Sequence, residues 1–318
     1  MYHVLINPTS KSGKGIKLWK ILEPIFAERD IKYKMMYSEY PGHIVKIVAK
    51  LTDPLEGYGR INLIVVGGDG TMNEVLQGII DFDNIRIGYI PTGSSNDFAR
   101  ALKYPKDPVR QLESIFDCEE PYPVDIGLLT YLDAVDDSGN PVTINRRFDV
   151  SCGIGFDAAV CEEAMHTDGI KGMLNKLKLG KLTYLAIALK HLLVRTGVSV
   201  TYTIDSQEPV KLSHFLFIAV MQNKYEGGGF MFCPEADCTD GLLDLCVVSV
   251  DSRAKVLLGI PLAFKGRHTM IKGIECKRAS KVRIRTSGPL WVHTDGEVHR
   301  MSKDFTVETL TTKLMLLR

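Results

Sequence analysis

Apolar and polar residues follow two different periods along the first 125 residues. Short apolar runs predict strands at residues 3–6, 32–37, 61–66 and 85–90. The third is a continuous, largely β-branched run, typical of a strand covered on both faces. Apolar residues at three- and four-residue spacing predict helices at about 15–26 and 42–51 and near Thr71 and Ser95, and we expect Pro24 to kink or end the first helix. Strands alternating with helices predict a parallel, doubly wound α/β sheet.

Beyond Asp125 the pattern changes to short strands separated by turns. Strands at 124–132 and 147–153 flank a turn at 136–140, which suggests antiparallel pairing. Helices are predicted at about 158–165 and 174–194, and further strands at 198–204, 212–221, 242–250, 281–286, 290–294 and 305–309. We therefore predict a doubly wound α/β domain over residues 1–125 and a mainly antiparallel, β-rich domain over 126–302. The pattern leaves open whether the strands of 303–318 return to the first domain.

The composition is that of a globular protein. Of its 318 residues 45% are hydrophobic, and 39 Lys and Arg oppose 38 Asp and Glu. These values exclude a disordered tail protein and a charge-driven nucleic-acid-binding arm, so we expect no nucleic-acid partner. The charge is nevertheless uneven, because residues 1–160 hold 17 basic and 22 acidic residues whereas residues 161–318 hold 22 and 16. The second half is the basic one.

Three further observations bear on the compartment. Met1 leads directly into an apolar run at residues 4–6 without the charged segment of a secretory signal, and no apolar stretch is long enough to span a membrane. The seven cysteines contain no C-x-x-C pair, Cys233 and Cys238 coming nearest. This spacing indicates neither a zinc site nor a disulfide framework, and predicts free thiols. We therefore expect a reduced, cytoplasmic protein.

A glycine-rich loop carries the first candidate chemistry. Residues 67–74 read GGDGTMNE and lie between the predicted strand at 61–66 and a helix. Glycines allow a ligand to approach the backbone closely, and a helix N-terminus favours phosphate. Asp69 would repel a bare phosphate, so it indicates Mg²⁺ together with a nucleotide. The spacing matches neither G-x-G-x-x-G nor the P-loop. The alternative is a glycine-lined turn in which Asp69 only caps the helix.

Two more polar loops are expected on the same edge of the sheet. Residues 90–97 read IPTGSSND and again join a strand to a helix, and residues 7–11 follow the first strand. Because ligands bind at the carboxyl ends of parallel strands, the three loops predict one ligand site. Taken alone, the second loop could be simple capping of a helix by Ser95 or Asn96.

Six motifs in order make the chain similar to the soluble diacylglycerol kinase catalytic family, which includes sphingosine kinases and bacterial lipid kinases. They are INPTSKSGKG (6–15), VVGGDGTMNE (65–74), PTGSSNDFAR (91–100), VDIG (124–127), EADCTDGLLD (235–244) and HTDGE (293–297). GGDGT alone also occurs in NAD kinases and phosphofructokinases, but its combination with the NDFAR loop is more specific. The resemblance implies a nucleotide-binding domain, a lipid substrate domain and an active site in the cleft between them. It also implies ATP-dependent phosphorylation of a lipid hydroxyl, with diacylglycerol giving phosphatidic acid.

The resemblance also implies site residues. The ATP-binding set is Asn7, Pro8, Thr9, Ser10, Lys11, Ser38, Gly67, Gly68, Asp69, Gly70, Thr71, Met72, Asn73 and Ser94. Glu297 matches the catalytic base and Asp295 its acidic neighbour, with Asp69 completing the catalytic residues. A structural Mg²⁺ site is implied at Asp237, Asp240 and the carbonyl of Leu242, and Asp125 resembles a member of the same acidic network. On spacing alone, 295–297 and 240–241 are also typical hairpin turns.

Two basic stretches without acidic residues, 169–204 and 252–274, suggest peripheral contact with an anionic membrane. Their alternative is a core-packing helix with solvated lysines. Two other functions stay open: an NAD kinase-like phosphotransferase, and a non-catalytic regulator that binds nucleotide or lipid. Glycines 227–229 suggest close backbone approach near the cleft, with a flexible turn as the alternative. The oligomeric state is undetermined by the sequence, and a homodimer is one alternative.

Overall fold

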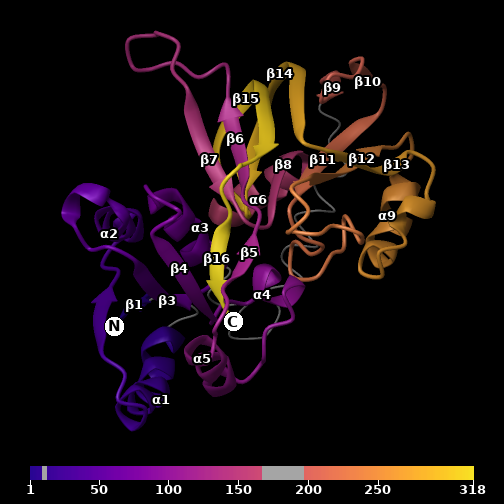
Figure 1. Ribbon diagram of the computed structural model, residues 1–318. Helices are drawn as coiled ribbons and strands as arrows, with labels where there is room; N and C mark the ends of the chain where they lie inside the picture. The colour runs from indigo at the N-terminus through magenta and orange to yellow at the C-terminus, as the bar shows by residue number, and fades with distance from the viewer. Residues whose placement is uncertain (9–12, 167–196) are drawn as a thin grey trace.

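The computed structural model describes residues 1–8, 13–166 and 197–318, which form two β-sheets joined side by side (Figure 1). The first sheet belongs to an α/β domain and the second to a β-rich domain, which confirms the predicted fold class. Thr9, Ser10 and Lys11 lie outside the described residues. So do the predicted helix at 174–194 and most of the basic stretch at 169–204.

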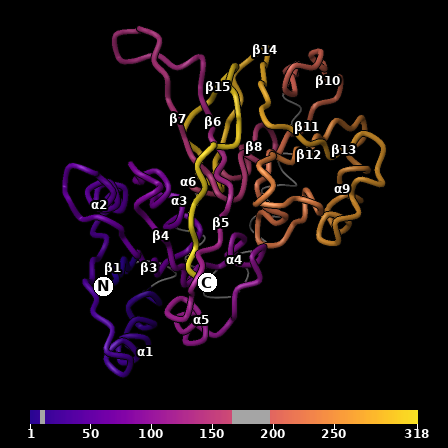
Figure 2. The backbone as a smooth tube through the Cα atoms, in the orientation of Figure 1, coloured from indigo at the N-terminus to yellow at the C-terminus, as the bar shows by residue number. Residues whose placement is uncertain are grey.

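The first sheet has six strands in the order β2-β1-β3-β4-β16-β5. Their bounds are β1 Tyr2–Ile6, β2 Tyr33–Tyr37, β3 Ile61–Gly67, β4 Ile85–Pro91, β5 Tyr122–Val124 and β16 Leu314–Leu317. Five strands are parallel, and β5 pairs with β16 in the antiparallel direction, so the sheet is mixed rather than wholly parallel. The last strand of the chain thus lies in the first sheet, as the path of the backbone tube shows in Figure 2.

Helices cover both faces of this sheet. The helices are α1 Lys14–Glu28, α2 His43–Thr52, α3 Asp69–Gly78, α4 Asp97–Ala101 and α5 Pro108–Phe116, with the 3₁₀ turn η1 Pro54–Glu56. Alternate strand residues pack on opposite faces: Leu5 meets α2 and α3, whereas Val4 and Ile6 meet α1 and α5. This double burial explains the nearly continuous apolar runs of the parallel strands.

The helix does not end at Pro24, so that part of the expectation was wrong. Helix α1 continues through this residue to Glu28. Pro24 lies on the exposed face, where water can bind the carbonyl that the missing N–H leaves without a partner. On the opposite face Trp19, Leu22 and Phe26 are buried in the core. Their packing holds the helix together across the proline.

The second sheet is antiparallel throughout. Its main path runs β13-β12-β11-β8-β14-β15-β6-β7, and β9 pairs with both β10 and β14. The strands are β6 Gly127–Tyr131, β7 Ile144–Phe148, β8 Ser151–Gly155, β9 Val200–Ile204, β10 Val210–Leu212, β11 Phe215–Met221, β12 Leu243–Ser249, β13 Ile274–Ala279, β14 Lys281–Thr294 and β15 Glu297–Thr309. The predicted strands at 281–286 and 290–294 are one strand, β14, with a register shift between Arg285 and Leu290. Strand β15 extends to Thr309 within this sheet, so only β16 of the segment 303–318 lies in the first sheet.

Helix α6 Phe156–His166, helix α9 Arg253–Ala263 and the 3₁₀ turn η2 His268–Met270 belong to the second domain. The pattern analysis did not predict α9 or β13. In α9 exposed apolar residues break the usual amphipathic spacing, and β13 is short and bears charges on its exposed face. Among the described residues, no helix is both long enough and apolar enough to cross a membrane.

An ion pair fastens the returning chain to the second domain. The ammonium of Lys313, just before β16, lies 2.7 Å from Oδ1 of the buried Asp125 and donates a hydrogen bond to the carbonyl of Thr239 at 2.8 Å. The other oxygen of Asp125 accepts a hydrogen bond from the N–H of Gly241 at 2.8 Å. Asp125 therefore links the last strand of the first sheet to the loop between β11 and β12.

Replacement of Lys313 by Met is expected to lower the free energy of unfolding by about 2 to 4 kcal/mol, because it leaves a buried carboxylate without its cation. The matched control is Lys281→Met, since Lys281 forms an exposed pair with Glu308 at 2.8 Å and should contribute less than about 1 kcal/mol. Urea unfolding of both variants measures the difference. Equal losses in the two variants would contradict the assignment.

Candidate active site

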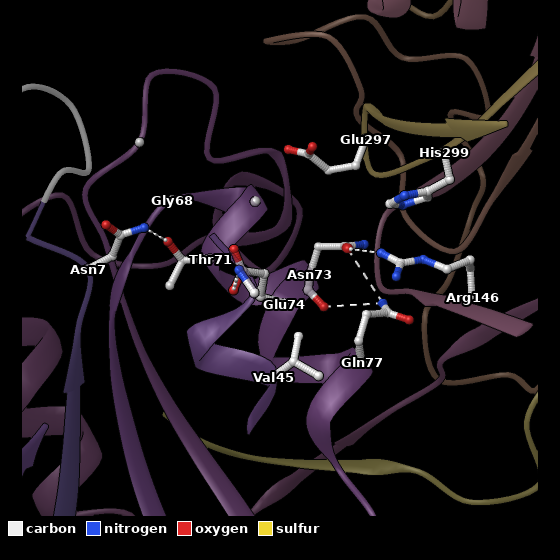
Figure 3. Close-up of a pocket in the computed structure, with 13 residues that line it drawn as sticks. Asn7, Val45, Gly68, Thr71, Asn73, Glu74, Gln77, Arg146, Glu297 and His299 are labelled. Atoms are coloured by element: carbon white, nitrogen blue, oxygen red, sulfur yellow. Dashed lines mark hydrogen bonds between the residues drawn. The ribbon is translucent and has the colours of Figure 1, made fainter. Parts of the chain in front are cut away.

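A cavity of about 490 Å³ lies where the two domains meet (Figure 3). The first domain and its helices contribute most of the lining, and the second domain contributes Arg146, Glu297 and His299. The other lining residues are Asn7, Gly42, Val45, Gly68, Gly70, Thr71, Asn73, Glu74, Gln77 and Gly93. The predicted cleft is therefore present, and it is polar on both sides.

The described parts of the three polar loops predicted on one edge of the sheet, which for the first loop are Asn7 and Pro8, do meet there. The amide of Thr92 donates a hydrogen bond to the carbonyl of Gly67 at 2.7 Å, and Nδ2 of Asn7 donates to Oγ1 of Thr71 at 3.0 Å. A Cβ added to Gly68 would lie 3.2 Å from the Cα of Gly93. The two glycine loops thus pack backbone against backbone, and a phosphate could approach their amides without obstruction by side chains.

Not every residue of the predicted ATP set lines the cavity. Asn7, Gly68, Gly70, Thr71 and Asn73 do. Met72 belongs to α3 but points into the hydrophobic core, where it is fully buried and packs the helix against the sheet. The amide of Ser38 donates to the carbonyl of Ile6 at 3.1 Å, which places Ser38 at the end of β2 on the same edge of the sheet. The roles assigned to Pro8, Gly67 and Ser94 stay predictions.

Asp69 opens α3 and lies in a group of acidic side chains. Its carboxylate accepts hydrogen bonds from the backbone N–H groups of Asn96 and Asp97, yet its Oδ1 atom is buried without a hydrogen-bond partner among the described residues. Burial, followed by the nearby charges of Asp97 and Asp295, raises the pKa of Asp69 to about 7. Burial and the charges of Asp295 and Asp69 also raise the pKa of Asp149. An unpartnered oxygen amid crowded carboxylates fits a divalent cation.

Glu297 faces the first turn of α3 from the second domain. A Cβ added to Gly70 would lie 3.0 Å from Oε1 of Glu297, and Figure 3 shows this carboxylate above α3. The residue before it in the chain, Gly296, and Asp295 form the two-residue loop between β14 and β15, both with positive φ (81° and 52°). Such a loop is a type I′ hairpin turn. The hairpin alternative is therefore correct as a description of the backbone, and the same turn presents Glu297 to the cavity.

Asp295 does not line the cavity, and its carboxylate instead binds several neighbouring segments. Its carboxylate accepts hydrogen bonds from Nδ2 of Asn73 at 2.8 Å and from the amides of Val150 and Ser151 at 2.9 and 3.0 Å. It thereby joins α3, the β7–β8 connection and the hairpin turn. Its predicted catalytic part stays a prediction, while its contacts are those of a positioning residue.

A buried histidine supports the same turn. Nδ1 of His293 accepts a hydrogen bond from the amide of Gly296 at 3.1 Å, and Nε2 faces Oε1 of Glu226 at 3.2 Å and Oδ2 of Asp157 at 3.4 Å. A single proton on Nε2 satisfies these contacts. The three ligand atoms lie within 4.8 Å of one another, so the group could also hold a cation. Sequence analysis missed Asp157 and Glu226 because neither lies at a motif spacing from His293.

Two cavity residues on the second sheet were also missed. The guanidinium of Arg146 donates a hydrogen bond to Oδ1 of Asn73 at 3.1 Å. Burial, together with the charges of Arg146 and His293, lowers the pKa of His299 to about 4, so its imidazole is neutral at pH 7. Neither residue lies in a predicted strand or in one of the motifs, so the sequence held no signal for them, and the place of Arg146 becomes informative only once β7 is known to lie against α3.

The predicted Mg²⁺ site at Asp237, Asp240 and Leu242 forms a compact turn. Oδ1 of Asp237 accepts hydrogen bonds from the amide and hydroxyl of Thr239 at 3.0 and 2.7 Å, and Oδ1 of Asp240 accepts one from the amide of Leu242 at 3.0 Å. The ammonium of Lys313, which pairs with Asp125, already brings a positive charge to this turn, because it donates a hydrogen bond to the carbonyl of Thr239. The ion-binding role of these residues stays a prediction.

The buried Asp69 leads to a pH dependence in metal-free protein. The pKa of Asp69 is higher in the folded state than in the unfolded state. The contribution of this residue to the free energy of unfolding is therefore fully present below about pH 4 and decreases as the pH rises to about 7. Asp69→Asn cannot ionise, so we expect it to be more stable than the wild type by roughly 2 to 4 kcal/mol at pH 8 and similar to it at pH 4. Chemical unfolding in the presence of EDTA measures this, with the exposed Asp137→Asn as control. A constant difference across this range would refute the assignment.

Comparison with known proteins agrees with this geometry. Residues 1–129 match the diacylglycerol kinase catalytic domain, and residues 150–317 match the YegS C-terminal NAD kinase beta sandwich-like domain. The chain is 28% identical over 299 residues to YtlR of Bacillus subtilis (strain 168), which is named as a presumed lipid kinase, and the match covers 92% of each protein. It is 30% identical over 243 residues to a diacylglycerol kinase of Mycobacterium tuberculosis (strain ATCC 25618 / H37Rv), covering 75% of this chain and 71% of the relative.

A solved structure shows the same fold. The crystal structure of a diacylglycerol kinase from Bacillus anthracis str. Sterne superposes with a TM-score of 0.67 at 21% identity, covering 99% of this chain and 96% of that one. The resemblance found in the motifs is thus confirmed by matches to both domains and by full-length relatives. The chain belongs to the diacylglycerol kinase catalytic domain family of lipid kinases.

Proposed function

We propose that this protein transfers the γ-phosphate of ATP to the hydroxyl of a membrane lipid, with diacylglycerol as the acceptor and phosphatidic acid as the product. One observation carries the proposal. The carboxylate of Glu297 lies next to the glycine-lined first turn of α3, and both line a cavity of about 490 Å³. A base therefore lies beside the proposed phosphate-binding loop, and the cavity that they line has room for an alcohol and a triphosphate end.

The chain's own residues can position both reactants. The amides of the Gly68 and Gly93 loops and the N-terminus of α3 suit the negative phosphate chain. A lipid alcohol is a very weak acid, so Glu297 accepts its proton as the new P–O bond forms. Arg146, held against Asn73, lines the cavity near Glu297 and offers positive charge to the transferring group. Phosphoryl transfer needs this positioning and charge more than covalent help from the protein.

Mg²⁺ fits beside this cavity, because Asp69, which lies between the cavity-lining Gly68 and Gly70, offers a buried oxygen without a hydrogen-bond partner among the described residues. When bound, Mg²⁺ would offset the charge of the phosphates during transfer. Asp69 would hold it, with Asp149 as the neighbouring carboxylate whose Oδ2 is likewise buried and unpartnered in the described structure. Neutralisation of this acidic group also explains how carboxylates with raised pKa values could be ionised near pH 7.

The alternatives are less well supported. An NAD kinase needs a second nucleotide site beside the NDFAR loop. Here Asp97 of that loop pairs with Arg100 at 2.8 Å and accepts a hydrogen bond from the amide of Gly228 at 2.8 Å, so it holds the loops together. A non-catalytic regulator would not need a carboxylate facing the phosphate loop. The deciding experiment offers labelled ATP with diacylglycerol, sphingosine, phosphatidylglycerol or NAD, and no transfer to any lipid would reject the proposal.

Replacement of Glu297 by Gln should lower kcat by about 10²- to 10⁴-fold, because the amide cannot accept the proton. ATP binding, measured by calorimetry, should change little. The control is Glu208→Gln, an exposed residue in the β9–β10 turn, which should leave both quantities unchanged. Loss of ATP binding in Glu297→Gln would mean that Glu297 binds nucleotide and that its assignment as a base is incorrect.

We further propose that the surface of α9 and η2 contacts anionic membrane. Four large apolar side chains are exposed there, Leu257, Leu258, Phe264 and Met270, and the last is 79% exposed. Exposed basic residues surround them, namely Arg253, Lys265, Arg267 and Lys272. Apolar residues flanked by positive charge suit the interface of a bilayer that contains anionic lipid. Of the two predicted basic stretches, this surface belongs to the second, residues 252–274, which lies wholly within the described residues.

The double variant Leu258→Glu, Met270→Glu should bind phosphatidylglycerol vesicles at least roughly tenfold more weakly, through lost apolar contact and added repulsion. Wild-type binding should fall with salt and be weak on phosphatidylcholine. Leu55→Glu is the matched control, because Leu55 is 93% exposed on the first domain. Vesicle sedimentation measures all of these, and equal binding by the double variant and the wild type would exclude this surface.

A further inference from the structure

Three cysteines and a histidine converge in the second domain, at residues that do not line the active-site cavity. Cys246 lies on β12 and Cys276 directly opposite it on β13, where the two are partners in the strand register. His268 lies in η2, and Cys233 lies in the loop between β11 and β12. Cys233, Cys246 and His268 are buried, whereas Cys276 is exposed. Four distant segments therefore bring one soft ligand each to one place.

The spacing of the ligand atoms suits a metal ion. Sγ of Cys246, Nε2 of His268 and Sγ of Cys276 all lie within 4.8 Å of one another, and the first two are 3.6 Å apart. In a tetrahedral Zn²⁺ site, with sulfur at about 2.3 Å and nitrogen at about 2.0 Å from the metal, these two ligand atoms are about 3.5 Å apart. The thiol of Cys233 lies outside this group of three atoms, but it is a hydrogen-bond neighbour of the thiol of Cys276 and is therefore the candidate fourth ligand.

The members of the group contact one another directly. The thiols of Cys233 and Cys246 and the ring of His268 each lie within hydrogen-bonding reach of the thiol of Cys276. A thiolate is the form of cysteine that binds metal. The carbonyl of Phe232 lies 3.0 Å from Nε2 of His268 and 3.3 Å from Sγ of Cys276, so without metal it can accept a hydrogen bond from either group. Metal binding through Nε2 would leave the imidazole proton on Nδ1 and release the thiol protons to solvent, and the exposed Cys276 gives the ion a route into the site.

We propose that Cys233, Cys246, His268 and Cys276 bind one structural Zn²⁺ ion. Three sulfurs and one imidazole are a ligand set typical of structural zinc, whereas Mg²⁺ and Ca²⁺ require oxygen ligands. The ion would join the β12–β13 edge, η2 and the β11–β12 loop. No C-x-x-C spacing indicates this site in the sequence, because each ligand comes from a separate segment. The site is independent of the proposed kinase reaction.

The β11–β12 loop is a segment for which such a link would matter. The amide of Gly228 donates to Oδ2 of Asp97, and the carbonyl of Cys238 accepts a hydrogen bond from the amide of Asp125 at 2.6 Å. Cys233 lies between these two contacts with the first domain. A metal at Cys233 would therefore fix the middle of a loop whose two ends already hold the domains together.

The test uses the full chain without a histidine tag, purified under reducing conditions from zinc-supplemented cells. Mass spectrometry for metals should find about one Zn²⁺ per wild-type chain and almost none in Cys276→Ser. Cys276 is exposed, so this variant should fold normally. The control Cys118→Ser, a thiol outside the cluster, should retain the ion. Removal of zinc with a chelator should lower the melting temperature of the wild type and of Cys118→Ser, but not that of Cys276→Ser.

Cobalt substitution identifies the ligands even if a variant fails to fold. Co²⁺ added to metal-free wild-type protein should produce a thiolate-to-cobalt charge-transfer band and the intense visible bands of tetrahedral coordination. Carboxylate sites, such as Asp69 or the Asp157–Glu226–His293 group, produce no thiolate band. The proposal is overturned if wild type and Cys276→Ser hold equal zinc, if no thiolate band forms, or if Cys246 and Cys276 are found as a disulfide in native protein.

Discussion

Helix α3 depends on the second domain at both ends, and this dependence governs the geometry of the whole site. The guanidinium of Arg147 donates hydrogen bonds to the carbonyls of Leu76 and Ile79, at 2.8 and 2.6 Å, which the last turn of a helix otherwise leaves without partners. Gln77 exchanges two hydrogen bonds with the backbone of Arg147, and Asn73 binds Asp295. The first turn of α3, for which phosphate binding is proposed, and the hairpin that carries Glu297 are therefore both tied to the same helix.

The same arrangement concentrates carboxylates that oppose one another. Burial raises the pKa of Asp69, Asp149 and Asp295, the charge of Asp295 raises the pKa of Asp69 and Asp149 further, and the charge of Asp69 also raises that of Asp149. Asp295 is partly compensated, because its carboxylate accepts hydrogen bonds from three backbone amides and Asn73. Asp69 retains a buried oxygen without such a donor among the described residues. A protein selected for stability alone would not keep such an oxygen. The hydrogen bonds to Asp295 are those of a residue that positions its neighbours, whereas the unpartnered oxygen of Asp69 suits a cation.

The sequence predicted those parts of the molecule in which local pattern and tertiary structure agree. Buried parallel strands produce apolar runs, and loops that need close backbone approach produce glycines, so the first sheet and its ligand edge could be predicted. The path of the second sheet could not, because β14 pairs with β8 and β15 pairs with β6 across long separations that leave no periodic signal. Pro24 shows a local rule overridden by packing. His293 shows the converse, since its partners Asp157 and Glu226 become visible only when the sheet brings them together.

The loop between β11 and β12 explains why so many of these contacts are made by side chains. An irregular loop has few backbone hydrogen bonds of its own, so its position must come from other interactions. Glu226 lies against His293, which in turn holds the amide of Gly296 next to Glu297. Two residues further on, the amide of Gly228 donates a hydrogen bond to Asp97, in the loop that follows β4. If Glu297 is the base and the loop after β4 binds nucleotide, as proposed, displacement of the β11–β12 loop would act on the base through His293 and on the nucleotide through Asp97. The β11–β12 loop thus supports both sides of the proposed site, although none of its residues lines the cavity.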